Sequence, residues 1–462
     1  MFRRIEFGLL ALHVPVLGAL MIATHPWLTA DSPRYLALGE ALQHGRGFGL
    51  GQGAAFEPEG MRLPGYPAYL ACTHWLFGDG NLAVVVMQSL LFLASVILIW
   101  RVTTRLLGAR TGMIFLGLSA VYPFVAYSAF QVSAETPVVF LVAASIYCLL
   151  DPTLARCALA GILIGFAGYV RPNLLPLSVA LASACVVADR KTLRGALIVV
   201  LAAGLVAMPW AVRNYRVFGV FAPTPAFSGT GPSLLLATWQ ARIPLPALIA
   251  YGMRGEASPE VQRAGMLDQV RDLNREIGVA PDVVFVTLQS YEGNATKAVA
   301  DRVLRRAALA NMRAWPLRYA WNVLECMPRL WFSSYMPERL PLLVRTLLRL
   351  EGLTVLLVGL GGAVLVTRRL RRAPQPALMA VLFSIGYFTL SLSFFHIEAR
   401  FTIPARLLLL ALAAHGLTEV SAIWHRKEQA HIVGHEAVEA HCQGSASTRR
   451  RRASVRDRVR MT

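Results

Sequence analysis

Charged side chains are scarce in this sequence, and acidic ones are the scarcest. Charged residues make up 15% of the 462 positions, with 26 Asp and Glu against 45 Lys and Arg. Soluble globular domains normally contain about 25% charged residues, so this composition excludes an ordinary water-soluble protein. No basic stretch is interleaved with aromatic residues in the pattern typical of nucleic-acid-binding surfaces, so we expect no nucleic-acid partner.

Metal-binding and targeting signals are also lacking. The six cysteines are scattered, most lie within or beside apolar runs, and none has the spacing of a metal-ligand motif, so we expect them to be structural. The chain shows no internal repeat. Its first apolar stretch is long, contains Pro15 and has no obvious cleavage site, which favours a retained helix over a signal peptide.

Apolar residues are abundant instead, at 56% of the chain, with a mean hydropathy of +0.52. A membrane-spanning helix needs roughly 20 consecutive apolar residues. We therefore predict an all-α polytopic membrane protein with about ten transmembrane helices. Their approximate ranges are 7–28, 81–100, 111–127, 134–150, 155–170, 173–188, 194–211, 344–367, 376–395 and 402–423.

The distribution of Lys and Arg in the short loops predicts the orientation. Basic residues at 3–4, 101–110, 156, 190–194 and 368–372 all fall on one side, which should be cytoplasmic. The basic tail, residues 425–462, follows the last span and is predicted to be a disordered cytoplasmic segment. Both chain ends are therefore expected on the cytoplasmic side.

The polar segments on the opposite side contain most of the unusual chemistry. The long ones are 29–80 and 212–343, and the second is expected to form amphipathic helices outside the membrane. Residues from distant parts of the chain are predicted to meet near this face: Asp31, Arg62, Glu135, Arg171, Arg213, His396, Glu398 and Arg400. This convergence is the main functional signal in the sequence.

Each of these residues also has a structural explanation. Asp31 precedes Ser32 and Pro33, so its carboxylate could cap a helix N-terminus. Glu135 could cap the next transmembrane helix in the same way. Arg171 could reach the membrane interface through its long side chain, and a lone His396 is more often an interfacial histidine than a metal ligand.

Five sequence blocks give a more specific signal in combination. They are "ADSPRYLALGEAL", "RLPGYPAYLACTHWLFG", "YVRPN", "PWAVRNYRVFG" and "HIEARFTIPA". Their order resembles that of GT-C-type membrane glycosyltransferases, and of the bacterial branch related to protein O-mannosyltransferases and lipid A aminoarabinose transferases. The resemblance covers roughly residues 5–424.

The resemblance implies a glycosyltransferase that takes a sugar from a polyprenyl-phosphate donor and passes it to a lipid, glycan or protein acceptor outside a bacterial inner membrane. The catalytic acid of the family's first loop falls on Asp31, and the transfer is expected to invert the configuration at the anomeric carbon of the sugar. Arginines suit the departing phosphate because guanidinium groups form charge-assisted bonds with its oxygens. The substrate-binding candidates are Arg62, Arg171, Arg213, Arg400, Tyr35, Glu135 and His396.

The sequence departs from the family pattern in the first loop. The aminoarabinose transferases have a metal-binding Glu before the Pro-rich block, and here Glu57 and Glu59 lie in that region without a clean alignment. A divalent metal at Glu57 and Glu59 is therefore an open expectation. The double Pro before "GYP" is Leu63 and Pro64 in this chain, and the acidic pair of eukaryotic protein mannosyltransferases is reduced to Asp31 and Ser32.

The expected architecture is a GT-C-type bundle whose first external loop forms juxtamembrane helices near 33–44 and 64–77. Its parts would be a catalytic module at 1–211, an extracytoplasmic segment at 212–343, C-terminal transmembrane helices at 344–424 and the tail at 425–462. A polytopic transporter or a flippase for lipid-linked glycans is the alternative. Such a protein should place charges near the middle of its spans and show repeats relating its halves.

Overall fold

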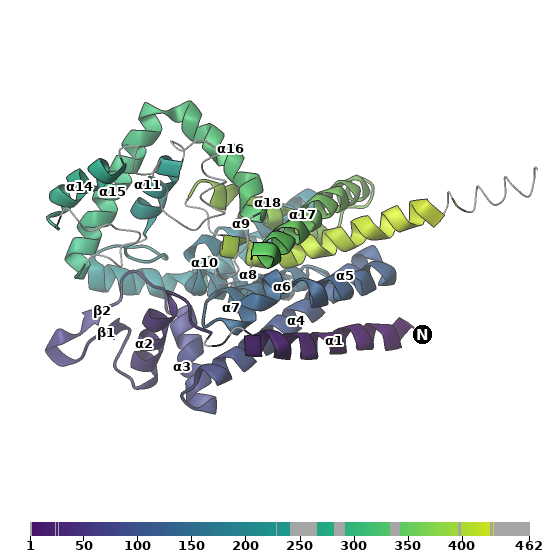
Figure 1. Ribbon diagram of the computed structural model, residues 1–462, viewed down its shortest axis with the longest axis horizontal. Coiled ribbons are helices and arrows are strands. Elements are labelled where there is room, and N and C mark those ends of the chain that lie inside the picture. The colour runs from purple at the N-terminus through teal and green to yellow at the C-terminus, as the bar shows by residue number, and fades with distance from the viewer. Residues whose placement is uncertain are drawn as a thin grey trace, which may run out of the picture.

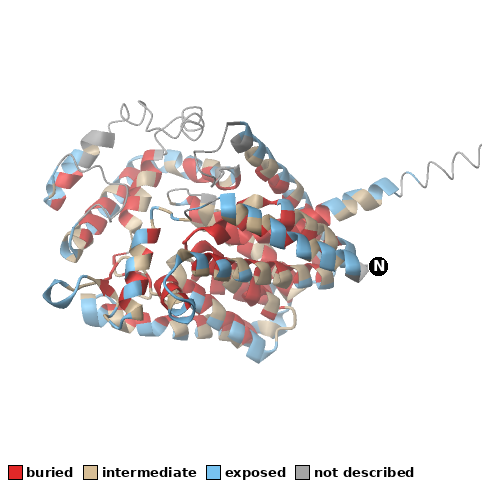
Figure 2. Cartoon of the chain, turned by 60° about the horizontal axis from the view of Figure 1, so that its bottom comes forward, coloured by how far each residue is buried: buried red, intermediate tan, exposed pale blue. Residues whose placement is uncertain are grey.

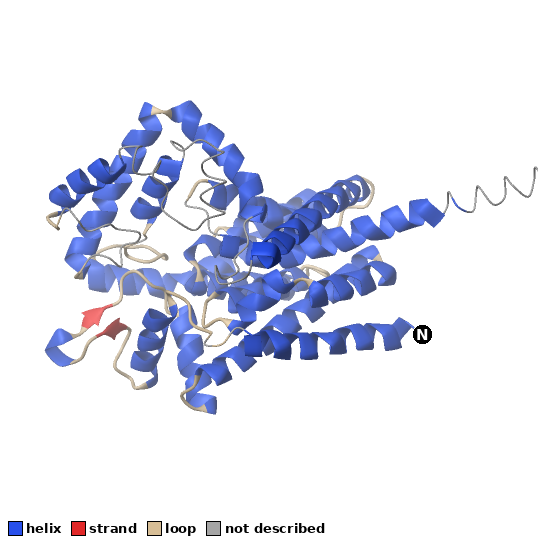
Figure 3. Cartoon of the chain, in the orientation of Figure 1, coloured by secondary structure: helices blue, strands red, loops and turns tan. Residues whose placement is uncertain are grey.

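The computed structural model describes residues 2–23, 25, 27–227, 229–240, 266–280, 292–332, 342–395, 399–425 and 428. These residues are almost entirely helical, and the strands among them are the two-residue β1 (Gly49–Leu50) and β2 (Glu57–Pro58), which pair antiparallel (Figure 3). The predicted all-α fold class is confirmed.

All ten predicted apolar segments are helical. The helices are α1 (Phe2–Ala23), α4 (Asn81–Leu107), α5 (Ala109–Val121), α7 (Glu135–Cys148), α8 (Leu154–Val170), α9 (Leu177–Ala188), α10 (Leu193–Phe218), α17 (Leu342–Leu370), α18 (Pro376–Ser393) and a last helix at 403–425. In the described parts of the chain, 6 helices are long and apolar enough to cross a membrane, or 7 if a bent pair counts as one span. The protein is therefore an integral membrane protein.

The remaining apolar helices are shorter than the prediction of about ten full spans implied. Helices α7, α8 and α9 contain 14, 17 and 12 residues. At about 1.5 Å per residue, 14 residues extend about 21 Å, which is less than a hydrocarbon core of about 30 Å. Chain breakers set these limits, since Pro172 lies two residues after the last residue of α8 and Pro176 precedes α9.

The bent pair consists of α5 and the short segment after it. Pro123 begins α6 (Pro123–Ala126), which continues into η2 (Tyr127–Phe130), and the axis turns by 60° at this point. Pro123 has no backbone N–H to donate into a continued α5 helix, so the break coincides with the proline. The bend directs the chain toward the segment that precedes α7.

The predicted juxtamembrane helices are both present in the first loop. They are α2 (Ser32–Gln43) and α3 (Gly65–Phe77), and the two helices pack against each other. The segment between them contains β1, η1 (Gly53–Ala55) and β2. Pro33 lies in the first turn of α2, where its fixed φ and missing N–H are tolerated.

A second group of helices lies between α10 and α17. It contains α11 (Thr230–Gln240), α14 (Met266–Ile277), α15 (Asn294–Ala314) and α16 (Pro316–Phe332). Helices α11, α14 and α15 share a small apolar core that includes Leu235, Leu273 and Leu304. The described parts of the two stretches predicted to be amphipathic are helical, and residues 241–265, 281–291 and 333–341 lie outside the described chain.

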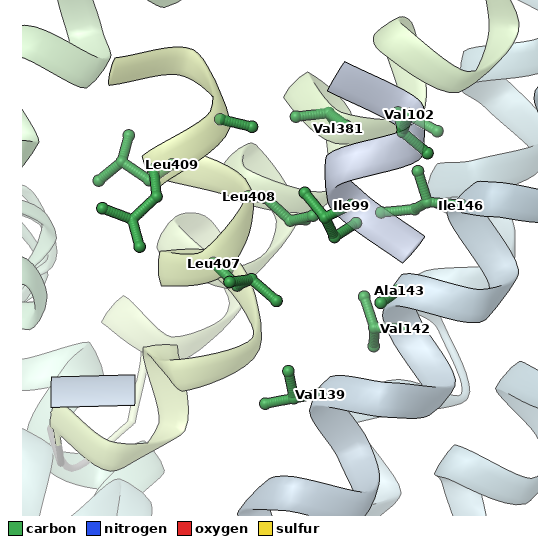
Figure 4. Packing of buried hydrophobic residues seen from close by; sticks show 14 of the residues in the cluster. Ile99, Val102, Val139, Val142, Ala143, Ile146, Val381, Leu407, Leu408 and Leu409 are labelled. Atoms are coloured by element: carbon green, nitrogen blue, oxygen red, sulfur yellow. The ribbon is translucent and has the colours of Figure 1, made fainter. Parts of the chain in front are cut away.

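The main core lies where the transmembrane helices meet. Figure 4 shows Ile99 of α4, Val142 and Ile146 of α7, Val381 of α18 and Leu408 of the last helix directed toward one another. Buried residues are concentrated inside this bundle, whereas many outward-facing apolar side chains are exposed (Figure 2). Burial in lipid accounts for such an exposed apolar surface, because a membrane helix needs no aqueous face.

The two ends of the bundle differ in what they carry. In Figure 1 the N-terminus and the end of the 403–425 helix lie at the right, whereas α2, α3, α14 and α15 lie at the left. The first-loop helices and the described helices α14 and α15 thus lie away from the end that carries the N-terminus.

Candidate active site

Hydrogen bonds attach the start of the first loop to the segment before α7. The Ser32 hydroxyl donates to the carbonyl oxygen of Val132 at 2.8 Å, and the backbone N–H of Val132 donates to the carbonyl oxygen of Trp27 at 2.8 Å. Ser32 also accepts from the backbone N–H of Thr29 at 2.7 Å. These contacts bring residue 31 close to residue 135, although about a hundred residues separate them in the chain.

The glycine of the "PGYP" block allows a second close approach. A Cβ atom at Gly65 would lie 2.7 Å from the backbone of Tyr169, so only glycine lets the start of α3 contact the end of α8 this closely. Arg62 precedes this contact on one segment and Arg171 follows it on the other. The block therefore brings two of the predicted arginines to the same place.

Asp31 forms ion pairs with two arginines. Its Oδ1 atom accepts from Nη2 of Arg62 at 2.6 Å, and its Oδ2 atom accepts from Nη1 of Arg400 at 3.0 Å. The side chain is 19% exposed, so water reaches it. Asp31 occupies the position before α2, but its carboxylate makes no capping hydrogen bond, which excludes the simple capping explanation.

These arginines also set the proton affinity of Asp31. Burial alone would raise the pKa of the Asp31 carboxyl, but the positive charges of Arg62, Arg400 and Arg171 hold that pKa below its usual value. Asp31 is therefore ionised at neutral pH. In this arrangement it is a weak base, because the guanidinium groups stabilise its charged form.

Glu135 extends the same chain of charges. It is 2% exposed, its Oε1 atom accepts a hydrogen bond from Nη2 of Arg171, and Nε of Arg400 lies 3.9 Å from that oxygen. Its other oxygen, Oε2, is buried and has no hydrogen-bond partner among the described residues. Arg400 is thus shared between Asp31 and Glu135, and the sequence of pairs is Arg62, Asp31, Arg400, Glu135, Arg171.

Aromatic rings support the arginines of this charge chain. The guanidinium carbon of Arg171 lies 4.6 Å from the ring centroid of Phe401, and that of Arg400 lies 5.4 Å from the same ring. Arg62 lies 5.2 Å from the ring of Tyr35. Cation–π contacts of this kind stabilise guanidinium groups in partly desolvated positions. The predicted Tyr35 therefore lies at the site, in contact with Arg62.

Glu59 has a structural arrangement rather than that of a metal ligand. Its Oε2 atom accepts from Nε and Nη2 of Arg34 at 2.9 and 2.5 Å, and its Oε1 atom accepts from the backbone N–H groups of Met61 and Arg62 at 2.6 and 3.0 Å. Both oxygens are therefore engaged in holding the loop before α3. The side chain is completely buried.

Glu57 also lacks the surroundings of a metal site. It is 43% exposed, and its charged neighbour is Lys297, with Nζ at 4.0 Å. No group of three His, Cys, Asp or Glu side chains suited to a metal ion occurs within the described segments. Since Asp31 is itself flanked by arginines, these residues do not fit the divalent cation that the family resemblance suggested.

Arg213 lies on α10 and binds the first loop. Its guanidinium donates to the backbone carbonyl oxygens of Glu59 at 2.8 Å and Phe48 at 3.4 Å, and it packs 4.7 Å from the ring centroid of Trp210. The neighbouring Asn214 donates to the carbonyl oxygens of Ala222 and Thr224 at 2.9 and 2.8 Å. The "PWAVRNY" block thus connects α10 to two loops, and Arg213 is not part of the charge chain around Asp31.

Three further residues complete the comparison with the sequence. The predicted His396, together with Glu398, lies outside the described residues. Arg406 was not predicted, although it is 2% exposed and stands within the last apolar helix. A positive charge inside an apolar run was the signal that could have identified Arg406.

An apolar cavity of about 340 Å³ lies beside the charged residues. It is lined by residues of α3, α4, α7 and α8, including Pro64, Tyr69, Phe140 and Phe166. Its lining reaches Val170, the residue before Arg171, and Pro137, two residues after Glu135. The cavity therefore extends away from the charge chain between helices of the bundle.

The sequence and structure match known proteins in two ways. Residues 60–212 match the family described as dolichyl-phosphate-mannose-protein mannosyltransferase. This segment contains Arg62, Glu135, Arg171 and the "PGYP" block, whereas Asp31 lies before it. The chain matches no curated protein sequence.

Solved structures of the Archaeoglobus fulgidus oligosaccharyltransferase have a similar fold. The apo form and the complex of AglB with an inhibitory peptide and a dolichol-phosphate each share 14% identity with this chain at a TM-score of 0.50. Each match covers 92% of this chain and 52% of the archaeal protein, so the chain spans about half the length of that relative. ArnT from Cupriavidus metallidurans bound to undecaprenyl phosphate matches with 14% identity, over 88% of this chain and 77% of that protein, at a TM-score of 0.39.

The helical bundle therefore has a fold similar to that of the Archaeoglobus fulgidus oligosaccharyltransferase. Within it, residues 60–212 are the part of the chain that is similar to the dolichyl-phosphate-mannose-protein mannosyltransferase family.

Proposed function

We propose that this protein transfers a sugar from a polyprenyl-phosphate donor to an acceptor at the extracytoplasmic face of a bacterial inner membrane, with Asp31 as the acid/base residue. The observation that carries the proposal is the charge chain of three arginines and two carboxylates. Its members come from the first loop, from the ends of α7 and α8, and from η6 (Ala399–Thr402).

The arginines of the charge chain suit a departing phosphate. Arg62, Arg171 and Arg400 outnumber Asp31 and Glu135, so the cluster carries a surplus positive charge that an anionic donor would neutralise. Their side chains are 22%, 18% and 18% exposed, which leaves them accessible to a ligand. Guanidinium groups donate bidentate, charge-assisted bonds to phosphate oxygens.

The proposed reaction is an inverting displacement at the anomeric carbon of the sugar. An acceptor hydroxyl or amine attacks this carbon, a new bond forms to the acceptor atom, and the bond from the sugar to the phosphate oxygen breaks. The electron pair of that bond leaves with polyprenyl phosphate, and Asp31 takes the acceptor's proton. A donor phosphate that binds Arg400 would compete with Asp31 for this arginine, and losing that contact would make Asp31 a stronger base.

The apolar cavity supports a lipid-linked donor. Its lining includes Val170 and Pro137, which are close in the chain to Arg171 and Glu135, and apolar side chains of α3, α4, α7 and α8. A prenyl chain would lie there while its phosphate meets the arginines. Burial of apolar surface contributes roughly 25 cal/mol per Å², so the prenyl chain would add binding affinity that a free sugar phosphate lacks.

The position of the charges favours this function over the transporter or flippase alternative. Glu135 is the first residue of α7, Arg171 directly follows α8, and Arg400 precedes the last helix. Residues that carry a substrate across a membrane are expected near the middle of the spans. This charge chain lies at helix ends, where a membrane-bound donor would meet an acceptor from water.

The decisive experiment compares Asp31→Asn with Asp151→Asn in the purified protein. Both aspartates pair with two arginines. Asp151 pairs with Arg105, in the last turn of α4, and with Arg156, and none of these residues belongs to the charge chain. Sugar release from synthetic undecaprenyl-phosphate sugars is measured together with thermal stability. We expect Asp31→Asn to reduce turnover by at least about a hundredfold, in line with the loss of a general base, and Asp151→Asn to leave it unchanged.

Retention of turnover within a few-fold in Asp31→Asn would remove Asp31 from the mechanism. If Glu135→Gln were inactive in the same assay, Glu135 would be the acid/base residue instead. Movement of an intact lipid-linked sugar between leaflets, without release of polyprenyl phosphate, would support the flippase alternative and refute the proposed transfer.

A further inference from the structure

Arg406 occupies an unusual position inside the last helix. It is 2% exposed, and its guanidinium donates to the Thr402 hydroxyl at 2.8 Å and to the Tyr122 hydroxyl at 2.8 Å. It also donates to the carbonyl oxygens of Leu330 and Trp331 at 3.0 and 2.9 Å. A charged side chain within an apolar helix is energetically unfavourable, so such a residue normally has a function.

One role of Arg406 is to bind backbone carbonyl oxygens of α16. Leu330 and Trp331, which accept these hydrogen bonds, are among the last described residues of that helix. The ring of Trp331 lies 5.7 Å from the guanidinium carbon of Arg406, which adds a cation–π contact.

The other contacts of Arg406 lead to the candidate active site. Thr402 lies in the η6 turn, two residues after Arg400, and is fully buried. Tyr122 stands at the bend between α5 and α6, and the ring of the nearby Phe124 lies 3.7 Å from the guanidinium carbon. One side chain thus connects α16, the bend and the turn that carries Arg400.

The connection from Arg406 to Arg400 through Thr402 is short. Arg400 and Thr402 belong to a single turn, and Arg400 contacts both Asp31 and Glu135 from it. Helix α16 packs against the same turn. The placement of the Arg400 backbone therefore depends on what holds Thr402.

We propose that Arg406 is a positioning residue that fixes the η6 turn through Thr402 and thereby holds Arg400 for the donor phosphate. This inference rests on the proposed function, because it takes Arg400 as a phosphate-binding residue. Arg406 itself does not touch the donor. It acts by linking helix α16 to the turn that binds the phosphate.

The test uses two matched substitutions, each of which removes one hydroxyl from Arg406. Thr402→Val breaks the link to the Arg400 turn, whereas Tyr122→Phe removes a bond that leads to the α5–α6 bend and leaves Thr402 in place. Affinity for undecaprenyl phosphate is measured in detergent on the full-length protein, with undecaprenol as the phosphate-free control. Thermal stability is recorded for every variant.

We expect Thr402→Val to weaken binding of undecaprenyl phosphate about tenfold, as expected for a displaced charge-assisted contact, and Tyr122→Phe to change it less than about twofold. Arg406→Lys keeps the charge but cannot reach all of these partners with one amine, and should resemble Thr402→Val. Equal affinities for Thr402→Val and wild type, or equal losses in Thr402→Val and Tyr122→Phe, would overturn the proposal.

A second readout does not need the donor. The carboxylate of Asp31 is followed by infrared titration, with Asp31→Asn as the reference that identifies its band. Displacement of Arg400 in Thr402→Val should raise the apparent pKa of Asp31, and Tyr122→Phe should leave it unchanged. If wild-type protein binds undecaprenyl phosphate no better than undecaprenol, the proposed donor is wrong, and this titration alone then decides the role of Arg406.

Discussion

Replacing Glu135 by Gln should destabilise the folded protein by about 2 to 3 kcal/mol. Glu135 is 2% exposed and contacts two guanidinium groups, those of Arg171 and Arg400. Removing one partner of a buried ion pair typically costs about 3 to 5 kcal/mol, because the remaining charge is left uncompensated. Both arginine side chains are 18% exposed and retain some hydration, so the expected cost lies at the bottom of that range or slightly below it.

The free energy of unfolding would be measured by reversible denaturation in mixed detergent and dodecyl sulfate micelles, followed by tryptophan fluorescence. A double-mutant cycle with Arg171→Gln isolates the pair, and we expect a coupling energy of at least about 1 kcal/mol. Asp151→Asn is the matched control, since its carboxylate is 42% exposed and solvent-screened, and should give no measurable change.

Two outcomes would refute this reasoning. If Glu135→Gln and Asp151→Asn had equal effects, the burial of Glu135 would have no energetic consequence. If the losses from Glu135→Gln and Arg171→Gln were additive, the two side chains would not interact in the folded protein.

Three further predictions concern donor binding, the pH dependence of stability and the membrane topology. Arg171→Ala and Arg400→Ala should each weaken binding of undecaprenyl phosphate by about one to two decades in a detergent binding assay, because each removes a charge-assisted bond. Unchanged affinity in both variants would exclude the two arginines as phosphate ligands. The folded-state pKa of Asp31 is lowered, so its ion pairs stabilise the protein fully above the ordinary Asp pKa of about 3.9. This stabilisation is lost as the pH falls through the lower folded-state pKa. The stability difference between wild type and Asp31→Asn should therefore shrink below about pH 4 in unfolding experiments. In a cysteine-free background, a thiol at exposed Ala54 should react with an impermeant reagent in intact cells and one at exposed Thr153 should react only after permeabilisation; the reverse pattern would invert the predicted topology.

The sequence predicted which residues gather in the charge chain better than it predicted how they pair. The charge pattern of the loops placed Asp31, Glu135, Arg171 and Arg400 at one end of the bundle, because topology follows from hydropathy and Lys/Arg bias alone. Which arginine meets which carboxylate depends on tertiary contacts. An example is the approach of α3 to α8 at Gly65, which one sequence cannot specify.

The first loop shows where the sequence was insufficient. Glu59 had the residue type and position of a metal ligand, but Arg34 and two backbone N–H groups occupy its oxygens. Arg213 was one of several candidate substrate-binding residues, and in the structure it donates to backbone carbonyl oxygens of the same loop. Both roles depend on how the loop folds back, and neither hydropathy nor residue spacing contains that information.

The ion pair between Asp31 and Arg400 also has a consequence for biosynthesis. Its two residues are 369 positions apart, so Asp31 leaves the ribosome long before its partner exists. At about 5 to 20 residues per second, this interval is roughly 20 to 70 s. During that time the charge chain lacks the arginine shared by its two acids. A nascent chain would therefore acquire its complete site only with the last helices, and one that stalls before residue 400 would have an unfinished one.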